Sequence, residues 1–199
     1  VMEQARPGFA AALNTGIAAA SSPRVGFLLS DDWLEPGAVE QCLPQGADIV
    51  STGHRKWYAD GVTSFERRAP SMEAYEALPD RERKAGYLKH FFLFRKAALE
   101  AAGGLDETLG DSPGIDDYDL IWTLLERGAT VAVIEESLYN YRDHEGSRLT
   151  LGEPAAMRAT MRRILAKHGV TGPEQERLLG EKARWFGAPI HSVIRGRRE

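Results

Sequence analysis

The segment that most constrains the fold is an apolar run that begins at Arg24 and stops abruptly at two adjacent carboxylates, Asp31 and Asp32. A short run of this kind, with Val, Phe and two Leu residues, is typical of a strand buried within a sheet. Open α/β sheets bind their ligands beyond the carboxyl ends of the strands, where these two acids stand. Paired carboxylates also suit a hard divalent cation. The segment predicts an α/β sheet with a ligand site at a strand end, although a plain turn before Pro36 would also use such acids.

Helical and strand patterns alternate over the first 150 residues. Apolar residues at helical spacing predict helices at about 7–20, 36–43, 96–102 and 116–127, and a helix with an exposed loop over 71–84. Runs of β-branched and aromatic residues predict strands at 47–58, 62–67, 87–94, 130–134 and 137–141. Later patterns are helical only, from Pro154 onward and over 173–186. We therefore expect an α/β body over residues 1–150 and a helical extension over residues 151–199.

Composition narrows the functions that the chain can have. Its 199 residues are 43% hydrophobic, enough for one substantial core, and carry a net charge of −4, which argues against a nucleic-acid surface. Cys42 stands alone, so an internal disulfide is excluded and a reducing compartment fits. No apolar run approaches the roughly 18 residues that a membrane span needs. We expect a cytoplasmic protein without nucleic-acid partners.

Two further clusters could carry chemistry. Asp116 and Asp117 begin an amphipathic helix, which would hold a carboxylate rigidly beside a cleft. Acids in the first turn of a helix are also favoured by capping and by the helix dipole, so a purely structural role is equally open. Arg142 and His144 stand close together and can contact phosphate or ligate a metal, although a single histidine is more often a surface or core residue.

The order of several short segments is more informative than any one of them. The segments are Asn14-Thr-Gly-Ile17, Phe27-Leu-Leu-Ser-Asp-Asp-Trp33, Phe94-Arg-Lys, Gly103-Gly-Leu-Asp-Glu107, Asp116-Asp-Tyr-Asp-Leu120 and Tyr141-Arg-Asp-His144 with Ser147. In this order they resemble the family 2 glycosyltransferases of the GT-A fold, over about residues 8–149. The resemblance implies a GT-A-like, Rossmann-like mixed sheet flanked by helices. It also implies transfer of a sugar from a nucleotide-diphosphate donor to a saccharide or lipid-linked acceptor.

The resemblance assigns roles to the acidic residues. Asp31 would bind Mg²⁺ or Mn²⁺ and Asp32 would support it and the donor, in a motif whose frequent first aspartate is Leu29 here. Asp117 would act as the general base. Asp116, where the family usually has glutamate, would position the acceptor or the donor sugar. A single base implies direct displacement with inversion at the anomeric carbon.

The later cluster has an implied role as well. Arg142 and His144 match a family element that lies near the donor diphosphate, and His144 is a second candidate metal ligand. Trp57 could stack on a sugar ring of the acceptor, although a tryptophan in a strand is more often a core residue. The basic end at 195–198 could contact an anionic membrane or a polyisoprenyl-phosphate substrate, which would make the protein peripheral to the membrane, although a solvated tail is the simpler interpretation.

The resemblance begins part-way through the family's usual catalytic domain. Members normally start with a strand, a helix and a strand, about 80 to 100 residues that complete the parallel sheet. We therefore expect a fold truncated at the N-terminus, either a fragment or a sheet that another chain completes. Two other functions stay open. One is a non-catalytic or partner-dependent binding fragment, and the other is a Mg²⁺-dependent phosphohydrolase that uses Asp31, Asp32 and Asp117.

Overall fold

The computed structural model describes residues 3, 6–58, 60–109, 115–142 and 154–183. The helices are α1 (Phe9–Ala19), α2 (Ala38–Cys42), α3 (Met72–Glu76), α4 (Arg81–Tyr87), α5 (Lys96–Ala102), α6 (Asp116–Glu126), α7 (Pro154–Lys167) and α8 (Gly172–Lys182), with short 3₁₀ turns at Leu43–Gln45 and Glu107–Leu109. The strands are β1 (Arg24–Gly26), β2 (Trp33–Leu34), β3 (Ile49–Trp57), β4 (Ser64–Arg67), β5 (Phe92–Arg95) and β6 (Val131–Arg142).

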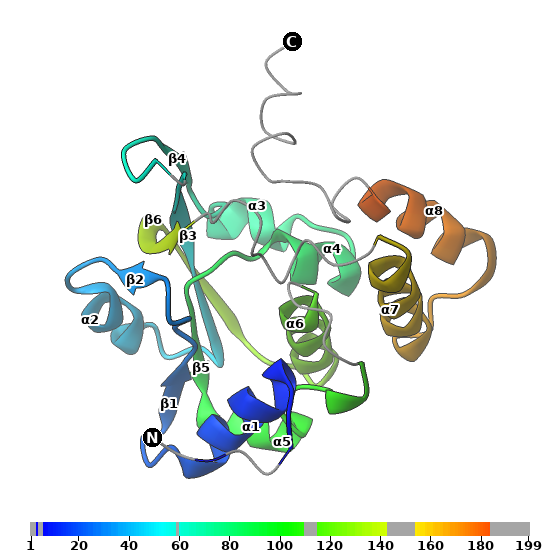
Figure 1. The fold of residues 1–199 in the computed structure, drawn as a ribbon, viewed down its shortest axis with the longest axis horizontal. Helices are drawn as coiled ribbons and strands as arrows, with labels where there is room; N and C mark the ends of the chain where they lie inside the picture. The colour runs from blue at the N-terminus through cyan, green and yellow to red at the C-terminus, as the bar shows by residue number, and fades with distance from the viewer. Residues whose placement is uncertain (1–2, 4–5, 59, 110–114, 143–153, 184–199) are drawn as a thin grey trace.

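The strands form one mixed sheet in the order β1-β5-β3-β6-β2 (Figure 1). β3 and β6 run parallel and form its long centre, whereas β5 and β2 pair antiparallel with them. β4 pairs with the far end of β3 as a hairpin. Residue Asp48 ties the sheet together at one end, because its carboxylate accepts hydrogen bonds from Thr130 before β6 and from Arg95 in β5.

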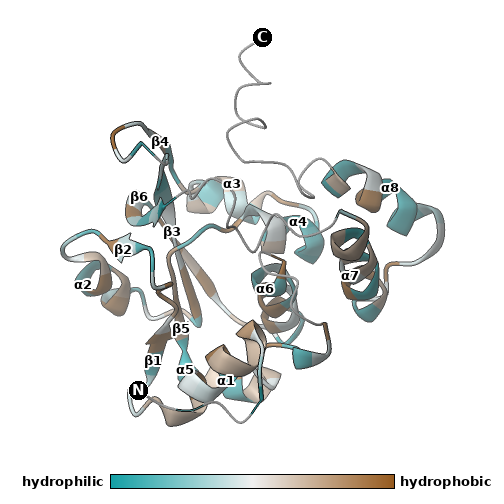
Figure 2. Ribbon diagram, viewed as in Figure 1, coloured by the Kyte–Doolittle hydropathy of each residue, from teal (hydrophilic) through white to brown (hydrophobic). Residues whose placement is uncertain are grey.

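Helices cover both faces of the sheet. The larger apolar core lies between the sheet and the helices α1, α4, α5 and α6, and it includes Phe92, Phe94, Leu99 and Leu120. The smaller core lies on the other face under α2, where Cys42 packs with residues such as Tyr139. Figure 2 shows apolar residues along α1 and the central strands. The expected α/β architecture, a mixed sheet flanked by helices, is confirmed.

Several element boundaries differ from those expected. The strand expected over 24–30 is limited to β1, whose ladder with β5 ends where Gly26 pairs with Leu93. Beyond it, Phe27 is partly buried and packs against Phe94, with ring centroids 5.4 Å apart. The strand expected over 87–94 begins only at Phe92. The side chain of Asp80 caps a helix that runs through Tyr87.

Other boundaries differ for local reasons. The stretch 71–84 contains two short helices, since Ser71 caps α3 and Asp80 caps α4. The two pieces expected at 130–134 and 137–141 are a single strand, β6. Between the two expected pieces, the pairing of β6 with β3 shifts register at Thr52, Gly53 and His54, and the strand continues. The expected helices at 96–102 and 116–127 are confirmed as α5 and α6.

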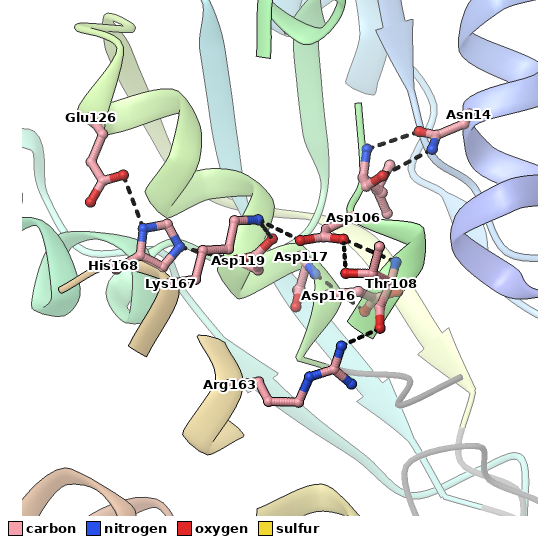
Figure 3. A network of polar contacts seen from close by, with 11 residues as sticks. Asn14, Asp106, Thr108, Asp116, Asp117, Asp119, Glu126, Arg163, Lys167 and His168 are labelled. Carbon is pink, nitrogen blue, oxygen red and sulfur yellow. Dashed lines mark hydrogen bonds and ion pairs between the residues drawn. The ribbon is translucent and has the colours of Figure 1, made fainter. Parts of the chain in front are cut away.

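The helix α8 packs against α7, and both contribute residues to the core that includes α6. Met161, Ile164 and Leu179 belong to the same buried cluster as Leu120. Figure 3 shows the polar contacts that accompany this packing, which centre on Asp119. The expected boundary at residue 150 lies outside the described residues. Within the described part, no helix combines the length and the apolar character that crossing a membrane requires.

Candidate active site

The turn after β1 carries the first acidic pair. The amide of Asp32 donates to the carbonyl of Leu29 across this turn, and the chain then enters β2. β2 pairs with the end of β6, so that Trp33 lies opposite Asn140 and Leu34 opposite Tyr139. This pairing brings Asp32 beside β6, while Asp31 is exposed.

Asp32 is 9% exposed and both of its oxygens are engaged. The hydroxyl of Tyr139 donates to Oδ2, and the backbone amide of Arg142 donates to Oδ1 at 2.9 Å. Burial raises the pKa of Asp32, and the negative charge of Asp31 adds to the increase. The hydrogen bonds from Tyr139 and Arg142 act in the opposite direction without cancelling it. Asp32 therefore anchors the turn, which leaves Asp31 as the more accessible carboxylate.

The second acidic pair begins α6. The backbone amide of Tyr118 donates to Oδ1 of Asp117 at 2.8 Å, and Oδ2 of Asp117 lies 3.0 Å from Nε2 of His90. Asp116 Oδ1 accepts a longer bond of 3.2 Å from the amide of Asp117. The N-cap of α6 is Ile115, which makes no side-chain cap bond, so these two carboxylates satisfy amides from within the first turn instead. This does not exclude a catalytic role, since the Asp117 side chain is 34% exposed.

Hydrogen-bond donors and an ammonium group lie around Asp117. Burial alone would raise the pKa of Asp117, but His90, the amide of Tyr118 and the ammonium of Lys89 outweigh it, so the pKa is lowered. Lys89 is itself affected, because burial and the nearby Arg67 lower its pKa to about 8 while Asp117 acts in the other direction. Asp117 is therefore held as a carboxylate at neutral pH.

His90 connects the two acidic pairs. Its ring centroid lies 5.8 Å from that of Tyr139, the residue that donates to Asp32, while its Nε2 faces Asp117. The electrostatic influence of His90 also reaches Asp32, whose pKa it lowers. The structure thus brings the segments 31–32 and 116–117 to the same region, separated by the side chains of His90 and Tyr139.

Arg142 lies at the rim of this region. Its guanidinium is 5.3 Å from the centroid of the Trp33 ring, and its backbone amide binds Asp32. Trp33 in turn lies 5.8 Å from Trp57, whose indole nitrogen donates to Asn140 at 2.7 Å. Trp57 is therefore fixed at the end of the sheet. It is only partly buried, so it is neither a core residue nor fully open to a sugar ring. His144 and the segment 195–198 lie outside the described residues.

The sequence interpretation assigned no role to His90, Lys89 or Tyr139. Tyr139 falls within the strand expected over 137–141, but nothing in the sequence tells which acid its hydroxyl would meet, 107 positions away. His90 lies between a helix and a strand, in a stretch assigned to a buried strand. The only sequence sign of a functional role was the polar pair Lys89-His90 inside a stretch expected to be a buried strand.

A bound cation would draw on few protein ligands. No group of three His, Cys, Asp or Glu side chains is placed to hold a metal within the part of the chain that the structure describes. Mg²⁺ is often held by one or two carboxylates together with substrate phosphates, rather than by a complete protein cage. An exposed Asp31 beside an anchored Asp32 fits that arrangement, and oxygen donors are the right type for Mg²⁺ or Mn²⁺.

The mixed sheet flanked by helices is that of an α/β protein of the glycosyltransferase A type. A crystal structure of S. aureus TarS superposes with a TM-score of 0.52 and 16% identity, over 90% of this chain and 50% of that one. Glucosyl-3-phosphoglycerate synthase from Mycobacterium tuberculosis, in complex with phosphoglyceric acid, gives a TM-score of 0.50 and 21% identity, over 84% and 57% of the two chains. At these identities the likeness concerns the fold alone.

Sequence comparison identifies the family. The model of glycosyl transferase family 2 matches residues 1–103, just over half of the chain. The O-antigen biosynthesis protein RfbC of Myxococcus xanthus is 29% identical over 168 residues, and the putative glycosyltransferase EpsH of Bacillus subtilis is 26% identical over 159 residues. The chain belongs to glycosyl transferase family 2, as the resemblance implied. These matches cover 80% and 74% of this chain but only 12% and 45% of the two relatives.

Proposed function

We propose that this chain is the acceptor-side portion of a glycosyltransferase catalytic domain, which transfers a sugar from a nucleotide-diphosphate donor to an acceptor hydroxyl with inversion. The observation that supports this most is the meeting of the segments 31–32 and 116–117 around His90. An acid suited to the donor side and an acid suited to the acceptor side then border one region.

Each acid has a separate task in the reaction. Asp117, kept ionised by its neighbours, accepts the proton of the attacking hydroxyl. Asp31 would hold Mg²⁺ or Mn²⁺, which when bound supplies positive charge to the departing diphosphate. Arg142, exposed and supported by Trp33, adds a second positive charge on the donor side. Asp116 positions a sugar hydroxyl beside the base.

A further strand would complete the donor half of the site. Among the described residues, β1 pairs with β5 along one edge and has no partner along the other. We propose that a preceding segment of a longer protein, or another chain, supplies a strand there. The donor-base contacts would lie on that added portion, as the family resemblance implies.

Titration calorimetry tests this function, with UDP, GDP and dTDP as probes, each with and without Mn²⁺. We expect at least one nucleotide to bind more tightly in the presence of Mn²⁺. Asp31→Ala should remove the Mn²⁺-dependent gain, whereas Asp117→Asn should keep it and instead lose about 10²- to 10⁴-fold in transfer rate.

Other outcomes would contradict the proposal. Equal binding with and without Mn²⁺ would argue against a metal on Asp31. If the chain binds none of the three nucleotides, alone or joined to its preceding segment, the non-catalytic alternative is favoured. Hydrolysis of p-nitrophenyl phosphate that depends on Asp31 would favour the phosphohydrolase.

A further inference from the structure

We propose that His90 is a positioning residue that orients the carboxylate of Asp117 and keeps it ready to accept a proton. This inference deepens the proposed function and rests on it for the meaning of Asp117. The family relationship does not supply it, since the residues that carry the resemblance do not include His90. It rests on three observations: the hydrogen bonds that fix the backbone beside His90, the ring contacts of the imidazole, and the hydrogen bonds of the two Asp117 oxygens.

The backbone on both sides of His90 is fixed by two buried hydroxyl groups. The Ser51 hydroxyl donates to the carbonyl of Lys89 and accepts from its amide at 2.9 Å. The amide of Phe91 donates to the Thr52 hydroxyl at 2.8 Å, and the amide of Thr52 donates to the carbonyl of Phe91 at 3.0 Å. Ser51 and Thr52 are fully buried in β3. The central strand of the sheet therefore sets the position of His90.

The ring of His90 is also held by packing. It lies edge-on against Phe92, with centroids 4.9 Å apart, and is tilted against Tyr139 at 5.8 Å. The side chain is nonetheless 42% exposed, because only part of the ring is covered. A ring with fixed backbone and two aromatic neighbours loses little further freedom when it binds a carboxylate. Such a group can hold a partner in one orientation.

The contacts of Asp117 show what this orientation achieves. The helix amide of Tyr118 binds Oδ1 and the imidazole binds Oδ2, so the plane of the carboxylate is determined by two donors on different elements. Each oxygen keeps a second lone pair, and the exposed third of the side chain is open to an acceptor hydroxyl. A base in a fixed orientation reacts faster than one that must find the correct rotamer.

Other titratable groups face this pair, and the test must separate their effects. Lys89 precedes His90 and acts on Asp117, while Tyr139 in β6 lies against the imidazole. Asp32 interacts electrostatically with His90. His54 in β3 also interacts electrostatically with His90. Burial together with nearby positive charges lowers the pKa of His54 to about 2, so His54 is neutral at neutral pH.

The test follows the protonation of Asp117 directly, without donor or acceptor. Protein labelled with ¹³C at aspartate carboxyl carbons is titrated by NMR, and the Asp117 signal is assigned by its loss in Asp117→Asn. In the wild-type protein the signal should titrate below the ordinary range of an aspartate, because the pKa of Asp117 is lowered. In His90→Ala it should titrate at a higher pH, since a donor that lowers the pKa has been removed.

Two further variants separate positioning from mere structure. His90→Gln places an amide N–H near the former Nε2 and should return the titration toward the wild-type position. His90→Asn is too short to reach and should behave like His90→Ala. The carboxyl of Asp60, in the β3–β4 turn and bonded within that turn, is the internal control and should titrate identically in every variant.

The result that overturns the proposal is an unchanged Asp117 titration in folded His90→Ala and His90→Asn, or an equal shift in His90→Gln. If His90→Ala does not fold, the Gln and Asn pair decides. Because no nucleotide is present, this outcome is independent of the calorimetry. A failure of nucleotide binding would contradict the proposed function and leave the His90–Asp117 pairing tested on its own.

Discussion

The side-chain amide of Asn14 occupies the space that a Cβ on Gly104 would need. Asn14 donates to the carbonyl of Leu105 at 2.9 Å and accepts from its amide at 2.8 Å, so α1 holds the turn that follows α5. Gly104 has a φ of +73°, and its neighbour Gly103 has a φ of +88° with open space around it. The segments 14–17 and 103–107, which are separate parts of the family resemblance, are thus in direct contact.

Alanine substitution should distinguish these two glycines. Gly103→Ala should cost about 1–2 kcal/mol of unfolding free energy through its left-handed backbone alone. Gly104→Ala should cost more, because the Asn14 amide must also move. In an Asn14→Ala background, the extra cost of Gly104→Ala should disappear. Urea denaturation of the single and double variants measures this coupling, and additive effects would contradict it.

Tyr139→Phe should destabilise the fold by about 1.5–3 kcal/mol, because the buried carboxylate of Asp32 loses its hydroxyl donor. Tyr75→Phe is the matched control. The Tyr75 hydroxyl is buried and has no hydrogen-bond partner among the described residues, so its removal should be neutral or stabilising. Chemical denaturation at pH 7 compares the two variants, and equal losses would rule out the special role of the Tyr139 hydroxyl.

Asp119→Ala should cost about 1–3 kcal/mol, since the buried imidazole of His168 loses a hydrogen-bond partner and Lys167 keeps only Asp106. Asp119 is 2% exposed and lies 2.7 Å from Nζ of Lys167 and 3.0 Å from Nε2 of His168 (Figure 3). The control is Glu176→Gln, which removes solvent-screened ion pairs between α8 and α7 and should cost much less. Thermal unfolding of both variants is the measurement. A small loss for Asp119→Ala would show that α7 is held by apolar packing alone.

The stability of the sheet should depend on pH through Asp48. Burial would raise its pKa, but hydrogen bonds from Thr130 and the contact with Arg95 outweigh this and hold the pKa below its ordinary value. A lowered carboxyl pKa stabilises the fold above the unfolded-state pKa, near 4, and this contribution disappears as the pH falls through the folded-state value. Asp48→Asn should therefore be less stable at pH 6, by about 0.5–1.5 kcal/mol, because solvent screens this partly exposed carboxylate.

The same variant should lose less stability than the wild-type protein when the pH falls below about 4. Urea denaturation from pH 6 downward gives the two curves. They should converge in acid, because the wild-type carboxyl is then protonated as well. Parallel curves would mean that Asp48 contributes through shape and not through charge.

Local patterns were sufficient for much of the fold. The helices α5 and α6 and the strand β3 follow from periodicity and from glycine or polar ends, and they fall within two residues of expectation at each end. The sheet order and the length of β1 did not follow. β1 ends with its ladder to β5, which is a segment 66 or more positions away.

The candidate site shows the same division. Asp31, Asp32, Asp116 and Asp117 could be named because acids at a strand end and at a helix start are local features. His90 could not be named, because its importance arises from Ser51 and Thr52 on one side and Asp117 on the other. Contacts of this range leave no periodic trace in a single sequence.

The reciprocal bonds of Ser51 and Thr52 have a consequence for substrate choice. They make residues 89–91 a stiff wall, because displacing that backbone would strand two hydroxyls and several peptide groups inside the protein. If Asp117 is the base, as we propose, an acceptor too bulky for the space beside it must gain room on the side opposite residues 89–91. Tolerance toward larger acceptors would then evolve by trimming that opposite side, with the histidine wall left as it is.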